Sequence, residues 1–112
     1  MPQPILTIAF DDGYNDTYRY SVSYIDQLGI KCTFAVPAGL IGKSCETRPV
    51  VKWIDLKKMY KRGHDIASHT LHHIDLLKTP LIRQAQKEII TSGKRLRTHL
   101  GGDITSFVYP YI

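Results

Sequence analysis

Short, mostly apolar runs alternate with longer amphipathic segments along the chain, and this alternation limits the folds open to it. We predict three helices from the spacing of their apolar side chains, at residues 15–28, 54–62 and 79–100. The predicted strands cover residues 5–10, 30–36, 64–68 and 104–109. Strands that alternate with helices in this way are typical of a parallel sheet with right-handed crossovers. The pattern therefore predicts an α/β fold.

Local signals set the expected ends of the helices. Gly29 and Gly63 stand where the first two helices should end, and Thr79-Pro80 offers an N-cap and a first helical residue for the third. Residues 37–51, between the second strand and the second helix, read as a loop. The third helix is expected to bury an apolar stripe. That stripe consists of Leu81, Ala85, Ile89, Leu96 and Leu100.

Residues 7–14 read TIAFDDGY, so two adjacent carboxylates stand at the end of the first predicted strand. Like charges at this range repel, and burial of either one unpaired is costly. One explanation is a helix N-cap, which needs only one carboxylate. The other is a ligand site, because the carboxyl ends of parallel strands are where α/β proteins bind ligands. Both explanations stay open on these residues alone.

A second polar cluster, SHTLHH at residues 68–73, follows the third predicted strand. His69 and His73 are four positions apart, so one helical turn would place both imidazoles on one face, with His72 pointing elsewhere. This spacing is a common way to present two nitrogen ligands to a metal, although a polar loop with unrelated histidines would read the same. Two histidines and one aspartate at one sheet edge would complete a three-ligand site with an open coordination position. The other aspartate would then be left to accept a proton from water.

Three segments in order, FDDGY, GHDIASHTLHH and FVYPY, resemble the first three motifs of the polysaccharide deacetylase family, also called the NodB-homology domain or carbohydrate esterase family 4. The resemblance extends to LGIKCTFAVPA and WIDLKKMYKRGH and covers nearly the whole chain. It implies a deformed (β/α) barrel of which residues 1–112 hold about the first half, with four strands and three helices. It also implies hydrolysis of N- or O-acetyl groups on carbohydrates.

The resemblance assigns roles to individual residues. Asp11 would be the general base, and Asp12, His69 and His73 would hold one divalent metal. Zinc is the default for this mixed oxygen and nitrogen ligand set, with cobalt, nickel or manganese as other choices. Thr70 matches a Ser/Thr that steadies the histidine segment. Pro110 and Tyr111 would belong to the substrate and oxyanion site, with the Tyr111 N–H as donor, although an ordinary strand-end turn would also explain them.

The sequence departs from the family pattern at two places. Val108 stands where many members carry an arginine that orients the base. No counterpart of the later motifs, including a histidine general acid, follows residue 112, and Trp53, His64 and His99 are poor substitutes. We therefore expect a partial deacetylase domain, belonging to a longer domain or completed by another copy. Alone, it should be marginally stable, inactive and prone to self-associate through open strand edges.

The expected function is that of a metal-dependent hydrolase that removes acetyl groups from acetylated carbohydrate, acting on carbon–nitrogen bonds other than peptide bonds. One alternative is a non-catalytic remnant of the fold that binds a metal or a glycan. Another is a purely structural fragment, in which the intact set of Asp12, His69 and His73 would be a coincidence. The last is a cyclic-amide or allantoin-type hydrolase on the same scaffold, which can work without metal. Retention of Asp12, His69 and His73 argues against this last alternative.

Composition excludes several other classes. The formal net charge is +5, but the basic residues lie on presumed helix surfaces without interleaved aromatic residues, which argues against a nucleic-acid partner. The apolar runs are too short to cross a membrane. Cys32 and Cys45 lack the spacing of a disulfide framework or a CxxC motif. The first residues do not resemble a secretion signal, so the expected location is cytoplasmic by default, or extracytoplasmic if a leader has been removed.

Overall fold

Three parallel strands form the sheet that the alternating pattern predicts. The protein is described here by a computed structural model that covers residues 1–111. The sheet has the order β1-β2-β5, with β2 (Thr33–Val36) between β1 (Ala9–Phe10) and β5 (Asp65–Ser68). In the register of the sheet, Phe10 lies beside Phe34, and Val36 lies beside Ser68. The carboxyl ends of all three strands therefore meet at one edge.

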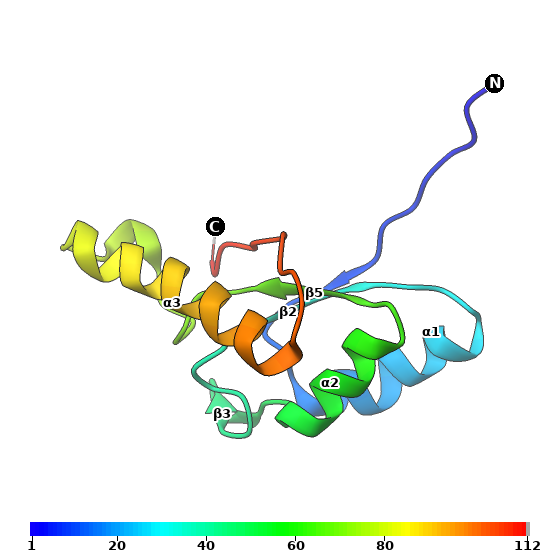
Figure 1. Ribbon diagram of the computed structural model, residues 1–112, viewed down its shortest axis with the longest axis horizontal. Helices are drawn as coiled ribbons and strands as arrows, with labels where there is room; N and C mark the ends of the chain where they lie inside the picture. Colours follow the sequence, from blue (N-terminus) through cyan, green and yellow to red (C-terminus); the bar gives the residue numbers. More distant parts are fainter. Residues whose placement is uncertain (112) are drawn as a thin grey trace.

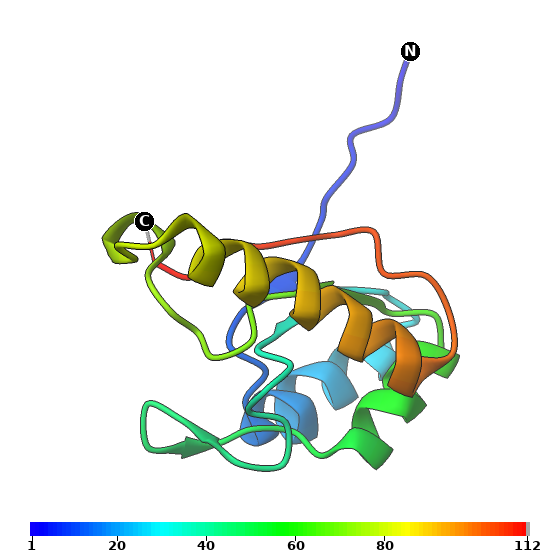
Figure 2. The same ribbon diagram turned by 60° about the vertical axis from the view of Figure 1, so that its left-hand side comes forward.

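Helices follow each strand. After β1 comes a π-helical turn (Thr17–Val22) that continues into α1 (Ser23–Gln27), and α2 (Trp53–Lys61) precedes β5. The longest helix, α3 (Ile82–Leu100), follows β5 and contacts both β5 and α2. In the two ribbon views, α1 and α2 lie below the sheet, α3 passes alongside it and the C-terminal segment crosses above it (Figures 1 and 2). No helix in the described residues is both long and apolar enough to cross a membrane.

The core lies between the sheet and its helices. It is built from β2, β5 and one face of each helix. Its fully buried large apolar side chains include Val22, Phe34, Val36, Leu56, Met59, Ile66 and Leu96. Because each side chain removed from water stabilises the fold by roughly 1.5–3 kcal/mol, this cluster fixes the sheet on which the functional residues sit.

Two predicted strands are much shorter than expected. Of residues 5–10, only Ala9–Phe10 pair as a strand, and the side chains of Ile5 and Leu6 are 92% and 85% exposed. The reason is that β2 begins at Thr33, so residues before position 8 have no partner strand. Of residues 104–109, only a single parallel bridge forms, between Ser68 and Phe107. The predicted fourth strand is thus one bridge beside the end of β5.

The helical predictions also need correction at their ends. The helix α3 begins at Ile82 with Leu81 as its N-cap, and not at Thr79-Pro80. Thr79 instead ends the 3₁₀ turn Leu76–Lys78, where its hydroxyl donates to the Asp75 carbonyl. Residues 37–51 are not a plain loop, because they contain a hairpin of β3 (Ser44–Cys45) and β4 (Arg48–Pro49).

The expected apolar stripe of α3 is also only partly correct. Leu96 is fully buried, whereas Leu81 and Ile89 are 65% and 37% exposed. The polar side chains of Glu88 and Ser92 are buried in their place. The face of α3 that packs inward therefore carries hydrogen-bonding groups.

Candidate metal centre

A tight turn after β1 separates the two adjacent aspartates. Asp12 and Gly13 both have left-handed backbone, with φ of 71° and 67°. A Cβ at Gly13 would lie 2.8 Å from Val36 Cγ1, so the turn needs glycine for space as well as for conformation. Asp12 turns inward and is half-buried, while Asp11 stays exposed. Neither caps the following helix, because Asp16 accepts the N–H of Thr17 there.

The two histidines are presented by a loop and not by the predicted helical turn. We call residues 69–73 the histidine loop. Thr70 and His73 have positive φ, of 64° and 57°, so the chain folds back on itself directly after β5. Such backbone is uncommon outside glycine, and for β-branched Thr70 it is a true outlier that costs roughly 1–3 kcal/mol. The fold-back nevertheless brings both imidazoles to the same place.

Asp12, His69 and His73 converge on one point. Asp12 Oδ1 lies 2.8 Å from His73 Nε2 and 3.1 Å from His69 Nε2. One ligand atom from each residue lies within 4.8 Å of the others. Both imidazoles are buried, at 2% and 7% side-chain exposure, so their positions are fixed by packing. The sequence prediction that these three residues meet is therefore confirmed.

The hydrogen bond on the far side of His69 shows that this donor set fits a metal. His69 Nδ1 lies 2.7 Å from the Val108 carbonyl oxygen, and because a carbonyl has no proton, Nδ1 must be the donor. In a neutral imidazole, Nε2 then carries a lone pair that faces the Asp12 carboxylate. Two hydrogen-bond acceptors would therefore face each other, which is unfavourable. A cation between them resolves the mismatch, as does a proton on Nε2. One oxygen and two imidazole nitrogens suit a divalent transition metal.

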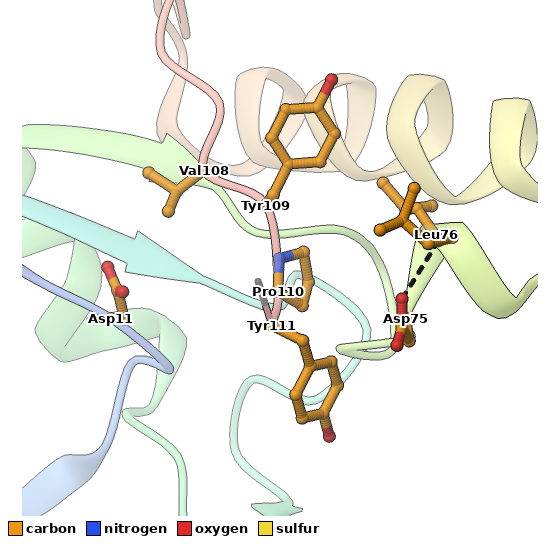
Figure 3. A pocket seen from close by; sticks show the side chains of 8 residues that line it. Asp11, Asp75, Leu76, Val108, Tyr109, Pro110 and Tyr111 are labelled. Atoms are coloured by element: carbon orange, nitrogen blue, oxygen red, sulfur yellow. Dashed lines mark hydrogen bonds between the residues drawn. The ribbon is translucent and has the colours of Figure 1, made fainter.

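Two adjoining cavities surround this point. The smaller, of about 270 Å³, contains Asp11 and the three ligand residues, and its rim carries Glu46, Tyr109 and Tyr111. The larger, of about 500 Å³, also reaches Asp11 and is walled by Leu76, Leu77, Val108 and Pro110. In Figure 3, Asp11 and Val108 lie on one side of the C-terminal segment, and Asp75 and Leu76 lie on the other. Asp11 and Tyr111 thus border both spaces.

Comparison with known proteins decides the family. Residues 1–112 match the family described as Polysaccharide deacetylase. The chain belongs to this family. YxkH of Bacillus subtilis is 31% identical over 104 residues, which is 92% of this chain and 35% of that protein. The chitooligosaccharide deacetylase of Sinorhizobium fredii is 27% identical over 96 residues, covering 84% of this chain and 40% of that protein.

The solved structure of IcaB from Ammonifex degensii has the same fold. The TM-score is 0.87 at 26% identity, over 99% of this chain and 52% of that one. The α/β prediction, with a parallel sheet and three helices, is confirmed, and the chain spans about half of this solved structure. It spans 35% and 40% of the two curated relatives.

The C-terminal segment contributes its backbone to this site more than its side chains. Val108 holds His69 through its carbonyl. The Tyr111 ring lies 4.9 Å from the His73 ring, and Tyr111 has a left-handed φ of 60°. Pro110 is buried beside them. The hydroxyl of Thr70 is buried without a hydrogen-bond partner among the described residues, so Thr70 steadies the histidine loop through its carbonyl, which accepts from Ala38 N–H and Ser92 Oγ.

Sequence reasoning missed one residue of this candidate site. Glu46, in the turn between β3 and β4, accepts a hydrogen bond from the Tyr111 hydroxyl at 2.8 Å, and its carboxylate lies 3.8 Å from His73 Nδ1. Glu46 and Thr47 both have positive φ, yet neither is the glycine or asparagine that usually marks such a turn. No local signal in the sequence could therefore have placed Glu46 here.

The remaining histidines serve other parts of the fold. His64 accepts the Cys32 N–H at Nδ1 and bonds Asp26 at 2.6 Å through Nε2, which ties β5 to the first helix. His99 stacks on Trp53 with ring centroids 3.9 Å apart.

Near the candidate metal ligands, burial and then the charge of Asp12 raise the pKa of the Tyr14 hydroxyl to about 12, so the phenol stays neutral.

Proposed function

We propose that this chain carries the metal-binding and proton-accepting part of a hydrolase that removes acetyl groups from N- or O-acetylated carbohydrate. The observation that supports it is the convergence of Asp12, His69 and His73 beside the exposed Asp11, in a chain of the polysaccharide deacetylase family. The reaction proposed is hydrolysis of a carbon–nitrogen bond other than a peptide bond, or of an acetyl ester.

Asp12, His69 and His73 would hold the divalent ion. When bound, such an ion polarises a carbonyl oxygen and lowers the pKa of water. The chain's own contribution is to keep the two imidazoles ready to ligate. The Val108 carbonyl fixes the protonated nitrogen of His69 and leaves Nε2 toward Asp12. Zinc is the ion proposed first, with cobalt, nickel and manganese next.

Asp11 is the proposed general base. Its carboxylate is exposed at the junction of the two cavities, next to the residue that supplies the oxygen ligand. It can therefore accept a proton from a water molecule that attacks an acetyl carbonyl in either cavity. These separate roles also reduce the repulsion between the adjacent carboxylates of Asp11 and Asp12, because the ion would offset the charge of Asp12.

The segment ending in Pro110 and Tyr111 is the proposed oxyanion and substrate wall. Both residues line the larger cavity, and the backbone N–H of Tyr111 would donate to the oxygen that becomes negative when the carbonyl is attacked. Leu76, Val108 and Pro110 give this cavity an apolar wall that suits an acetyl methyl group. The group that protonates the departing amine is not assigned among these residues.

Metal binding is the first test. Calorimetric titration of the chain with zinc should show one site, lost in His69→Ala and His73→Ala. Affinity should fall at acid pH, because protonated imidazoles cannot ligate. His99→Ala is the matched control, since His99 stacks on Trp53 and takes no part in the ligand cluster. A parent chain without metal uptake, or histidine variants that bind as the parent does, would overturn the site.

Acetate release tests the reaction. It should be measured on acetylated chito-oligosaccharide with and without chelator, for the chain and for any longer form of the protein. We expect Asp11→Asn to abolish turnover with metal affinity intact, whereas Asp12→Asn should lower metal affinity itself. Metal binding without turnover in every form would favour the non-catalytic remnant. Turnover that is insensitive to chelator would favour the cyclic-amide type of hydrolase.

A further inference from the structure

A buried carboxylate on α3 that lines neither cavity bonds the histidine loop. Glu88 is 6% exposed. Its Oε2 accepts the backbone N–H groups of Leu71, at 2.9 Å, and of His72, at 2.8 Å. Its Oε1 bonds His72 Nδ1 at 2.7 Å. A buried carboxylate is costly unless it is well bonded, and these three contacts meet that need with groups of one short loop.

Ser92, four positions further along α3, extends the same contact. Its hydroxyl donates to the Thr70 carbonyl at 2.9 Å. A hydroxyl has one proton, so the 2.7 Å contact between Ser92 Oγ and Ser68 Oγ must be donated by Ser68. The spacing of Glu88 and Ser92 places both on one face of the helix. That face therefore bonds the end of β5 and three consecutive residues of the histidine loop.

The histidine loop needs such support because its conformation is unfavourable by itself. Thr70 and His73 have left-handed backbone, which persists only where the surroundings hold it. The loop is anchored from the segment after β2 by Gly39 N–H, which donates to the Leu71 carbonyl, and from the C-terminal segment by the Val108 carbonyl. Glu88 accepts the N–H groups of Leu71 and His72, two of the three residues between His69 and His73.

We propose that Glu88 is a positioning residue that sets the geometry of the His69–His73 pair, so that metal affinity is controlled from α3. Glu88 touches neither ligand imidazole and acts through the backbone between them. The inference rests on the metal site proposed above. Ser92 has the supporting role of fixing the Thr70 carbonyl at the start of the loop.

The test compares four chains. Glu88→Ala removes every contact with the loop, and Glu88→Gln keeps an oxygen that can accept both N–H groups. Leu96→Ala is the control, because Leu96 is fully buried on the same helix and its loss lowers stability without touching a hydrogen bond of the loop. We expect zinc affinity to fall about 10- to 100-fold in Glu88→Ala, as for other groups that orient metal ligands. Glu88→Gln and Leu96→Ala should stay close to the parent.

Two further measurements separate positioning from general stability. The visible absorption spectrum of the cobalt-loaded chain reports ligand geometry and should change in Glu88→Ala and not in Leu96→Ala. Amide hydrogen exchange without metal should accelerate at Leu71 and His72 in Glu88→Ala, relative to Phe34 in β2. If Glu88→Ala does not fold, Glu88→Asp, whose carboxylate is one methylene shorter, should show the same changes to a smaller degree.

Parent affinity, spectrum and exchange in folded Glu88→Ala, or in Glu88→Asp where Glu88→Ala does not fold, would overturn the inference. A parent chain that binds no metal would instead overturn the proposed function. The exchange experiment would in that case still decide whether Glu88 holds the loop.

Discussion

Gly39→Ala is a direct probe of the packing behind the histidine loop. The N–H of Gly39 donates to the Leu71 carbonyl at 2.7 Å. A Cβ at Gly39 would lie 2.6 Å from the Leu71 carbonyl oxygen, 3.0 Å from Leu71 Cγ and 3.1 Å from His72 Nε2. Real Cβ atoms do not approach a backbone oxygen so closely. The two segments must therefore separate, although Glu88 and Ser92 hold the loop from its other side.

The expected cost follows from these contacts. Overpacking of a tight site typically costs about 1–3 kcal/mol, and a weakened hydrogen bond from Gly39 adds roughly 0.5–1.5 kcal/mol. For a domain near this size, each kcal/mol lowers the melting temperature by about 4–8 °C. The assay is urea unfolding of the metal-free chain, followed by zinc titration. We also expect weaker zinc binding, because the displaced carbonyl lies between the two ligand histidines.

Gly93→Ala is the matched control, because the same substitution at this position should raise the stability of the chain instead of lowering it. Gly93 lies inside α3, and the atoms nearest to an added Cβ would be those of the Arg97 guanidinium, at 3.4 Å, an ordinary van der Waals distance. Replacement of a helical glycine by alanine should stabilise the chain by roughly 0.5–1 kcal/mol. Equal stability and equal zinc affinity of Gly39→Ala and the parent would refute the close contact on which the calculation depends.

Two more predictions follow from the described geometry. Burial raises the pKa of the Cys32 thiol from 9.0 to about 11 and is the main cause that raises the pKa of Tyr14 from 10.0 to about 12. Because the unfolded chain loses these protons at lower pH than the folded chain, their contribution to stability is complete below pH 9 and declines as the pH rises toward 12. The urea concentration at the unfolding midpoint should therefore decrease as the pH is raised from 8 to 10.5, roughly the window set by these values. A midpoint that does not decrease would contradict this. Val108→Ala should leave zinc affinity unchanged by calorimetry, because the bond to His69 comes from the main chain, and a clear loss would show that the side chain is needed.

The sequence identified the elements whose signals are local. Residues 30–36 and 64–68 contain β2 and β5, and residues 54–62 match α2 to within one residue. The convergence of Asp12, His69 and His73 was also predictable, because side chains that follow strands of one parallel sheet lie at the same edge of that sheet. The two shortened strands could not be foreseen, since their length depends on where the partner strand begins.

The histidine loop and its supports depend on contacts between distant segments. Periodicity predicted a helical turn, but bonds from Gly39, Glu88 and Val108 fix a folded-back loop with left-handed residues. The same bonds explain why polar side chains occupy the buried face of α3 where an apolar stripe was expected. The sequence does not show which backbone group a polar residue at a buried helical position will bond. For Glu88 these groups lie 16 and 17 residues away in the chain.

The hydrogen bond between His69 and the Val108 carbonyl couples the candidate metal centre to the C-terminal segment. The nitrogen that would ligate the ion and the nitrogen that bonds the carbonyl belong to one imidazole ring. Whatever immobilises residues 107–111, such as a substrate lying against Tyr111 or a further strand beside this segment, would then tighten metal binding. By thermodynamic linkage, the ion would strengthen that second event by the same factor. Assembly of the substrate wall and loading of the metal would thus be allosterically coupled through a single ring.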